Sequence, residues 1–171
     1  MSLIRNGVAI DDAWVRLDDD TPAAPGARAI VSLQRWKAEK SRLTEILAGV
    51  GVLLKSSESA EDIADDLSVL EVVAVDFPAF TDGRSYSTAR ILRERYRYLG
   101  EIRAVGDVLR DQYGFMVRCG VDAFELSDAV DTAEWIKAVN EIPTAYQPAA
   151  DGRSPLFRVR AETPQDAWLA Y

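Results

Sequence analysis

The sequence contains no histidine, one cysteine and no long apolar run. Without histidine, Ser-His-Asp triads and imidazole metal ligands are excluded. The single cysteine, Cys119, cannot form an internal disulfide, which fits a reducing compartment. No apolar stretch is long enough to span a bilayer, and no signal-peptide pattern opens the chain. We therefore expect a cytoplasmic protein with no membrane partner.

Basic residues are also under-represented, because 20 Lys and Arg face 28 Asp and Glu and leave a formal net charge of −8. A generic nucleic-acid partner is not expected, since such proteins neutralise phosphates with basic side chains. Hydrophobic residues make up 48% of the 171 positions. That supply is sufficient for the core of a single compact domain.

Short apolar runs alternate with amphipathic segments through the middle of the chain. The expected strands are residues 50–54, 70–75, 102–105 and 123–126, and the expected helices are 59–67, 85–99, 109–118 and 131–142. This alternation predicts the α/β class, with a four-stranded, mainly parallel βα core and right-handed crossovers. The sheet is expected to be open or half-barrel-like, since a closed eight-stranded barrel takes about 250 residues.

The core is expected over residues 49–143, with an addition at each end. Residues 1–48 should form a β-hairpin around Asn6-Gly7, with residues 13–17 extending the ribbon, and a helix over 33–47. Residues 144–171 form a C-terminal extension with a possible strand at 156–160 and an aromatic tail. Because an open sheet has unpaired edges, we expect a homodimer.

Charged residues follow the predicted parallel strands. Asp76 and Asp107 end two successive strands, so their carboxylates should share one edge and are our candidate catalytic acid and base. With Glu125 they could instead hold Mg²⁺ through oxygen. Neighbouring cations such as Lys55 favour ion pairs over a metal, so no metal site is predicted.

An anion site is the second candidate at this edge. Arg84 and Ser85 open the helix expected after Asp82-Gly83, where free N–H groups favour an anion. Arg90 and Arg110 are the other candidate anion ligands. The simpler alternative is that Ser85 caps the helix while Arg84 pairs with Asp82 or Asp107.

A partner-contact surface is the third candidate. Arg93 and Arg97 continue a stripe from Arg90 along one helix flank, and the stripe could contact an acidic partner or remain solvated. Trp168, in the aromatic tail, either folds back onto the body or meets a partner. Cys119, before a glycine at a helix end, is read as a buried small residue.

The stretches "DFPAFTDGRSYSTARILRERY" and "GEIRAVGDVLRDQYGFMVRCGVDAFEL" resemble the DUF934 family of bacterial proteins. Ser85 departs from the family pattern, in which glycine is common at that place. The resemblance implies a link to assimilatory sulfite reduction, where members are described as probable oxidoreductases. It implies an accessory protein that contacts sulfite reductase or its electron donor. The alternative is a small-anion (sulfite, sulfate or phosphate) binding enzyme or an oxidoreductase that uses the charged strand ends.

No cofactor is evident from the residues themselves. The sequence has no Rossmann fingerprint, no cysteine cluster for an iron–sulfur centre and no haem ligand pair. Flavin remains open, because it can bind without a short motif.

Overall fold

The computed structural model describes residues 2–127, 132–138 and 145–162. Its strands are β1 (Ser2–Arg5), β2 (Val8–Ile10), β3 (Val15–Arg16), β4 (Arg28–Ser32), β5 (Gly49–Leu54), β6 (Val72–Phe77), β7 (Glu101–Gly106) and β8 (Ala123–Leu126). Its helices are α1 (Leu33–Ile46), α2 (Arg84–Glu94), α3 (Tyr113–Arg118), α4 (Thr132–Ala138) and α5 (Leu156–Glu162), with 3₁₀ turns η1 (Ala60–Asp66) and η2 (Arg110–Gln112).

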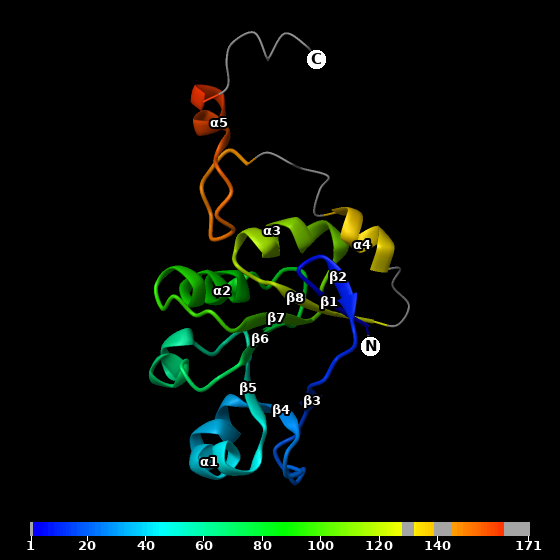
Figure 1. The fold of residues 1–171 in the computed structure, drawn as a ribbon, viewed down its shortest axis with the longest axis vertical. Helices are drawn as coiled ribbons and strands as arrows, with labels where there is room; N and C mark the ends of the chain where they lie inside the picture. Colours follow the sequence, from blue (N-terminus) through cyan, green and yellow to red (C-terminus); the bar gives the residue numbers. More distant parts are fainter. Residues whose placement is uncertain (1, 128–131, 139–144, 163–171) are drawn as a thin grey trace.

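The strands form one eight-stranded sheet in the order β2-β1-β8-β7-β6-β5-β4-β3. Strands β3 to β8 run parallel, while β1 is antiparallel to both β8 and β2. The α/β class and an open, curled, half-barrel-like sheet are therefore confirmed. The predicted four-stranded core is too small, because the parallel block continues through β4 to β3 (Figure 1).

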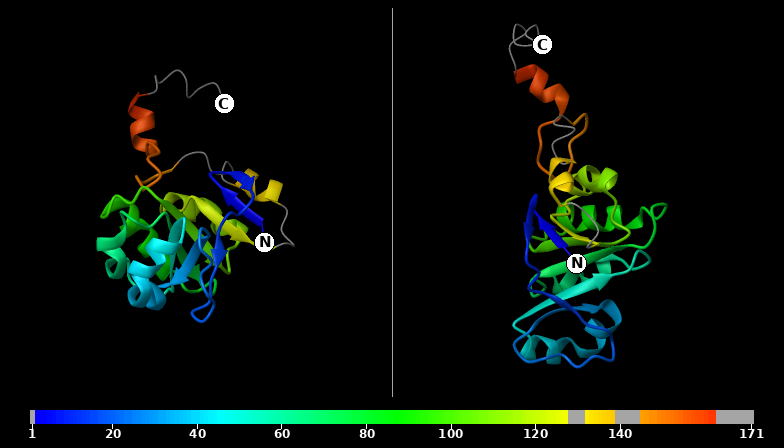
Figure 2. Two further views of the ribbon diagram at one scale, coloured as in Figure 1. Left: turned by 60° about the horizontal axis from the view of Figure 1, so that its bottom comes forward. Right: turned by 90° about the vertical axis from the view of Figure 1, so that its right-hand side faces the viewer.

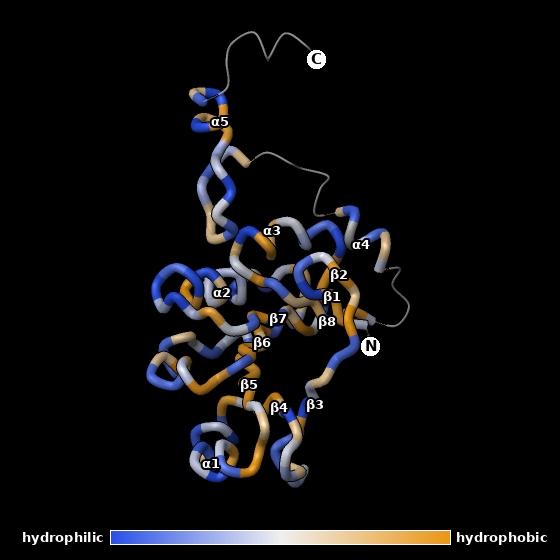
Figure 3. The backbone as a smooth tube through the Cα atoms, in the orientation of Figure 1, coloured by the Kyte–Doolittle hydropathy of each residue, from blue (hydrophilic) through white to orange (hydrophobic). Residues whose placement is uncertain are grey.

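The helices that follow the parallel strands cover one face of the sheet. Trp36 of α1, Ile63 of η1, Leu92 of α2 and Met116 of α3 all lie in the main core cluster, each at most 1% exposed. The alternate residues of the strands meet them, as Val73 and Val75 of β6 do. Orange, hydrophobic strands accordingly fill the centre of the molecule (Figure 3). The period-2 pattern of each strand thus sets which side the helices cover.

The opposite face of the sheet is concave and has its own small cluster, Ile30, Val72, Ala74 and Val105, against which Trp14 and Leu53 pack. Contacts cross this face between strands that are far apart in the sheet. Arg16 of β3 pairs with Glu125 of β8 at 3.1 Å. Since β7, β6, β5 and β4 separate these two strands in the sheet order, the pairing requires strong curling (Figure 2).

The N-terminal hairpin forms as predicted, with positive φ at Asn6 (50°) and Gly7 (77°). Those values suit a type I′ turn. The expected extension of the ribbon by residues 13–17 is wrong. Strand β3 instead pairs in parallel with β4 at the far edge of the sheet. Residues 11–14, called the strap below, connect β2 at one edge of the sheet to β3 at the other. A chain of this length spans at most about 20 Å, so the curled sheet must bring its two edges within that distance.

Two further segments differ from the expected elements. Helix α2 ends at Glu94, and Arg97 has a φ of 53°, so the predicted helix over 85–99 is too long. Leu99, expected in its apolar face, is 96% exposed. The predicted strand over 156–160 is wrong, because these residues begin α5. A short Leu-Phe-Arg-Val pattern fits a strand or a helix. Here the carbonyl of Pro155 accepts hydrogen bonds from the N–H groups of Arg158 and Val159, which is the pattern of a helical turn.

The C-terminal segment 145–162 rises from the body beside α3 and ends in α5, which has no buried residue (Figure 1). The Ala150 N–H donates to the carbonyl of Arg118, and Arg118 pairs with Asp151 at 3.2 Å. These contacts fasten the segment to the end of α3. None of the helices in the described part of the chain is long and apolar enough to cross a membrane.

Candidate functional site

The two candidate catalytic carboxylates lie at the ends of neighbouring strands. Asp76 stands opposite Val105 in the β6–β7 register, and Asp107 directly follows β7. The Asp107 N–H donates to the carbonyl of Phe77 at 2.7 Å. Gly106 permits this approach, since it has a φ of 94° and an added Cβ would lie 2.5 Å from that carbonyl oxygen. Asp76 is half-buried, whereas Asp107 is exposed.

Arg84 binds within its own turn. Its guanidinium donates to Asp82 at 2.9 and 2.7 Å and to the hydroxyl of Ser56 at 3.0 Å. The hydrogen bonds from Arg84 hold the pKa of Asp82 well below its usual range. Of the two partners considered for Arg84, Asp82 and Asp107, the structure therefore shows Asp82.

Ser85 is buried, and its hydroxyl donates to the carbonyl of Asp76. It is not the N-cap of α2, because that position belongs to Gly83. The other candidate anion ligands have separate partners. Arg90 pairs with Glu94 at 2.9 Å, and Nε of Arg110 donates to the carbonyl of Glu134 at 3.2 Å. The four candidate anion ligands thus contact four different groups of the protein rather than one shared site.

Asp76, Asp82, Arg84 and Asp107 lie at or after the ends of β6 and β7, and we call this edge the rim. Burial raises the pKa of Asp76, and Asp82 adds to that effect, while Arg16 and Lys55 oppose it. The sequence offered no reason to include Arg16, because β3 was not expected beside this face. The structure thus assembles a half-buried acid with two cations near it, a setting in which a carboxyl can exchange a proton.

The variant Asp76→Asn is expected to change the pH dependence of stability. Because burial raises the pKa of Asp76 above its unfolded value, the folded state holds this proton more tightly. The stability from this group is full below the unfolded pKa and is lost as pH rises through the folded pKa. Urea denaturation between about pH 3 and about pH 7 should show the wild type losing stability relative to the variant as pH rises. The opposite trend would show that the cations dominate.

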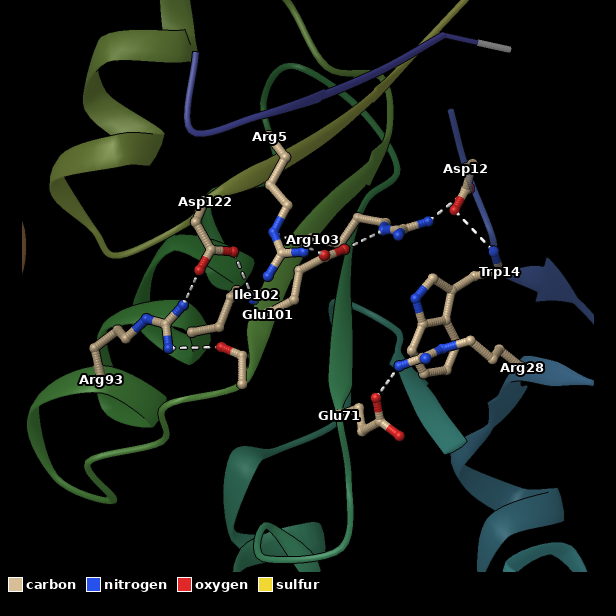
Figure 4. Close-up of polar contacts among 11 residues, drawn as sticks. Arg5, Asp12, Trp14, Arg28, Glu71, Arg93, Glu101, Ile102, Arg103 and Asp122 are labelled. Carbon is tan, nitrogen blue, oxygen red and sulfur yellow. Dashed lines mark hydrogen bonds and ion pairs between the residues drawn. The ribbon is translucent and has the colours of Figure 1, made fainter. Parts of the chain in front are cut away.

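Arg93 points into the protein, so the exposed stripe predicted for α2 does not form. Its Nη2 pairs with Asp122 at 2.5 Å (Figure 4). In addition, Nε donates to the carbonyl of Gly120 at 2.9 Å, and Nη1 donates to the carbonyls of Tyr98 and Gly100. Burial raises the pKa of Asp122, while Arg93 opposes that change. Arg93 thus ties α2 to the loops that enter β7 and β8.

A groove with a volume of about 690 Å³ lies beside this arginine. Arg97, Leu99 and Arg153 line it, together with the turn at Asn6-Gly7. Its apolar lining comes from Tyr113, Val117, Val121 and Phe124. We call this the loop groove. Of the candidate partner residues, it contains Arg93 and Arg97, while Trp168 lies outside the described residues.

Cys119 is 7% exposed, and burial raises the pKa of its thiol. A raised pKa disfavours the thiolate that nucleophilic and redox chemistry use. In the described ranges, no group of three or more Cys, Asp and Glu is arranged to hold a metal ion.

A family model for a bacterial protein of unknown function, DUF934, matches residues 51–157, which is more than half of the chain. The chain belongs to the DUF934 family. A comparison with curated proteins gave no match. The DUF934 segment begins within β5 and ends within α5, so it contains Asp76, Arg84 and Arg93. It also contains every lining residue of the loop groove except Asn6 and Gly7. Strands β1 to β4 and the strap precede it.

Proposed function

We propose that this DUF934 protein is a cytoplasmic accessory protein of assimilatory sulfite reduction, which docks on sulfite reductase or on its electron donor. The pathway comes from the family resemblance. The observation that carries the docking role is Leu99, a large apolar side chain that is 96% exposed at the edge of the loop groove. Exposed apolar groups beside a groove with polar edges are typical of protein interaction sites.

The chemistry of the loop groove defines the partner surface that would fit it. Arg97 makes no ion pair with any described residue, and its side chain is exposed beside Leu99. Arg153 lies on the other side, near Asp151 at 3.6 Å. An apolar side chain with a carboxylate next to it would cover Leu99 and pair with Arg97. Such a contact places an apolar anchor within a charged edge, as protein interfaces commonly do.

The double variant Arg97→Glu/Leu99→Ser should abolish this contact. We expect co-purification with sulfite reductase, or with its electron donor, to fall about tenfold or more, since one apolar anchor and one cation are lost. Pull-downs on each purified partner separately tell the two apart. Arg90→Glu is the matched control, because Arg90 is exposed on α2 and pairs only locally with Glu94.

Three outcomes would separate the possible occupants of the groove. Unchanged capture of both partners by the double variant would rule out the loop groove as their docking site. Loss of capture only on deletion of residues 163–171 would move the contact to the tail that contains Trp168. Conversion of a dimer to a monomer by the double variant would assign the groove to a second copy of this chain.

Small-anion binding at the strand-end rim is the second candidate function. The observation that favours it is Asp76, a carboxyl with a raised pKa that has two cations, Arg16 and Lys55, near it. The rim would hold a sulfite, sulfate or phosphate ion with Asp76 as the proton carrier. Thermal unfolding with each anion, in the wild type and Arg84→Gln, tests whether this end of the sheet takes part.

A further inference from the structure

The concave face holds a buried arginine with one unused donor. Arg103, in the middle of β7, is 1% exposed. Its Nε donates to Glu101 at 2.7 Å, and Nη1 donates to Asp12 of the strap at 2.7 Å (Figure 4). Its Nη2 is buried and has no hydrogen-bond partner among the described residues. An unpaired buried N–H group of a charged side chain is unfavourable, so this atom calls for an acceptor.

Two carboxylates beside Arg103, Glu101 and Asp12, accept from other donors, and neither accepts from its Nη2. Glu101 accepts from Arg103 through one oxygen and faces Nε of Arg5 at 3.3 Å through the other. Asp12 accepts from Arg103 and also from the backbone N–H of Trp14 at 3.0 Å. The carboxylates therefore leave the buried Nη2 of Arg103 as a donor without an acceptor.

A cavity of about 280 Å³ adjoins these groups, which we call the strap pocket. Arg103 lines its buried side, whereas Arg5 and Arg28 have side chains that are 49% and 42% exposed. Trp14 of the strap forms one wall, and the Arg28 guanidinium stacks 4.8 Å from the centre of its ring. Arg28 also pairs with Glu71. Three guanidinium groups thus surround one small cavity.

We propose that the strap pocket binds a small oxyanion, with one oxygen accepting from Nη2 of Arg103 and the others facing Arg5 and Arg28. This site lies near the amino ends of the parallel strands, since Glu101 opens β7 and Arg28 opens β4. It is therefore distinct from the rim at Asp76, which lies near the carboxyl end of β6. The planar guanidinium fork suits the oxygens of such ions.

Size and charge limit the ligand. The cavity volume of about 280 Å³ lies at the lower end of the roughly 300–1,000 Å³ of ligand sites, which favours a small ligand. Arg5, Arg28 and Arg103 are balanced by Asp11, Asp12 and Glu101 in the lining. Recognition therefore rests on aligned donors rather than on a net positive field. The shared feature of the expected ligands is an anionic oxygen, as in sulfite, sulfate, phosphate or a small carboxylate.

Trp14 allows binding to be followed directly. Titration of the whole protein with sodium sulfite, sulfate, phosphate and acetate, each at constant ionic strength set with chloride, should give a saturable fluorescence change for at least one anion. Trp14→Phe should remove the fluorescence change, and calorimetry on the wild type should give one site per chain. The comparison of the four anions distinguishes tetrahedral or pyramidal inorganic ions from carboxylates.

Variants at the mouth of the pocket assign the site. Arg5→Gln and Arg28→Gln should each weaken binding about tenfold, the usual effect of losing one charge-assisted hydrogen bond. Arg42→Gln, an exposed arginine of α1 that lies 3.4 Å from Glu39, should leave binding unchanged. Arg103→Lys should abolish binding, and its circular dichroism shows whether it folds. The two mouth variants keep the proposal testable if it does not.

Two results would overturn the proposal. If none of the four anions saturates beyond the chloride control, water satisfies Nη2 and the pocket is not an anion site. If Arg84→Gln weakens binding while Arg5→Gln and Arg28→Gln do not, the anion binds at the opposite end of the sheet. The outcome does not depend on whether the loop groove docks a partner, because the two sites share no lining residue.

Discussion

Arg93→Met is expected to lower the free energy of unfolding by about 3 kcal/mol, the lower end of the range for a buried ion pair, because this pair is only partly buried. The variant leaves the Asp122 carboxylate without its cation and the carbonyls of Tyr98, Gly100 and Gly120 without a donor. The methionine retains much of the packing of the arginine stem, so the loss reports mainly on polar groups. Urea or thermal denaturation measures it.

Arg90→Met supplies the control on the same helix. Arg90 is exposed and pairs with Glu94 on the same helix, so little change in the free energy of unfolding is expected. Gly120→Ala tests the same contact from the other side, because Gly120 has a φ of 97° and an added Cβ would overlap the Arg93 side chain. If Arg93→Met were as mild as Arg90→Met, the interpretation of Arg93 as a structural link would be wrong.

Trp36→Ala should destabilise the fold by about 3–5 kcal/mol, the range for replacing a buried tryptophan by alanine. Trp36 of α1 is 0% exposed and packs in the main core cluster. Its indole N–H also donates to Asp66 of η1 at 2.8 Å, so one side chain joins two elements on the same face of the sheet. The loss combines a large cavity with an acceptor left unpaired.

Trp36→Phe separates the two contributions. The phenyl ring retains most of the packing but cannot donate to Asp66, which Lys40 still contacts. We expect a loss of about 1–3 kcal/mol for a hydrogen bond to a charged group plus some volume. Chemical denaturation of both variants measures the difference. A loss in Trp36→Phe equal to that in Trp36→Ala would mean that packing around the indole contributes little.

The sequence was most informative where a strand is buried on both faces. Residues 72–77 and 123–126 are near-continuous apolar runs bounded by turns, and both form strands of the parallel block. A helical segment also forms within the predicted range 59–67, where Ser59 and Asp62 make a capping box, although the segment is a 3₁₀ helix. In these places local pattern and tertiary packing agree, so local inference is sufficient.

Local pattern failed where distant contacts decide the structure. Residues 15–16 form a strand only because β4 lies beside them, and two residues carry no periodicity. The end of α2 at Glu94 depends on Arg93, which binds carbonyls of the chain beyond the helix. No alternation of apolar and polar residues along one segment reports such long-range hydrogen bonds.

The candidate site shows the same division. Asp76 and Asp107 lie at the same edge of the sheet because parallel strands end there, a rule that needs only the strand assignment. The strap pocket could not be predicted, because its groups come from β1, the strap, β4 and β7. Arg103 in particular lies within a buried strand, and no residue pattern along that strand indicates that its other face is concave and polar.

The strap has a consequence for how the chain acquires its shape during translation. Strand β1 is synthesised near the start, yet its partner β8 comes more than a hundred residues later, with register pairs such as Leu3 and Glu125. During synthesis the N-terminal hairpin therefore stays without its partner strand until β8 has been made, whereas β4 to β7 can pair with one another earlier. Closure of the concavity is then a late, non-local event, of the kind that slows folding.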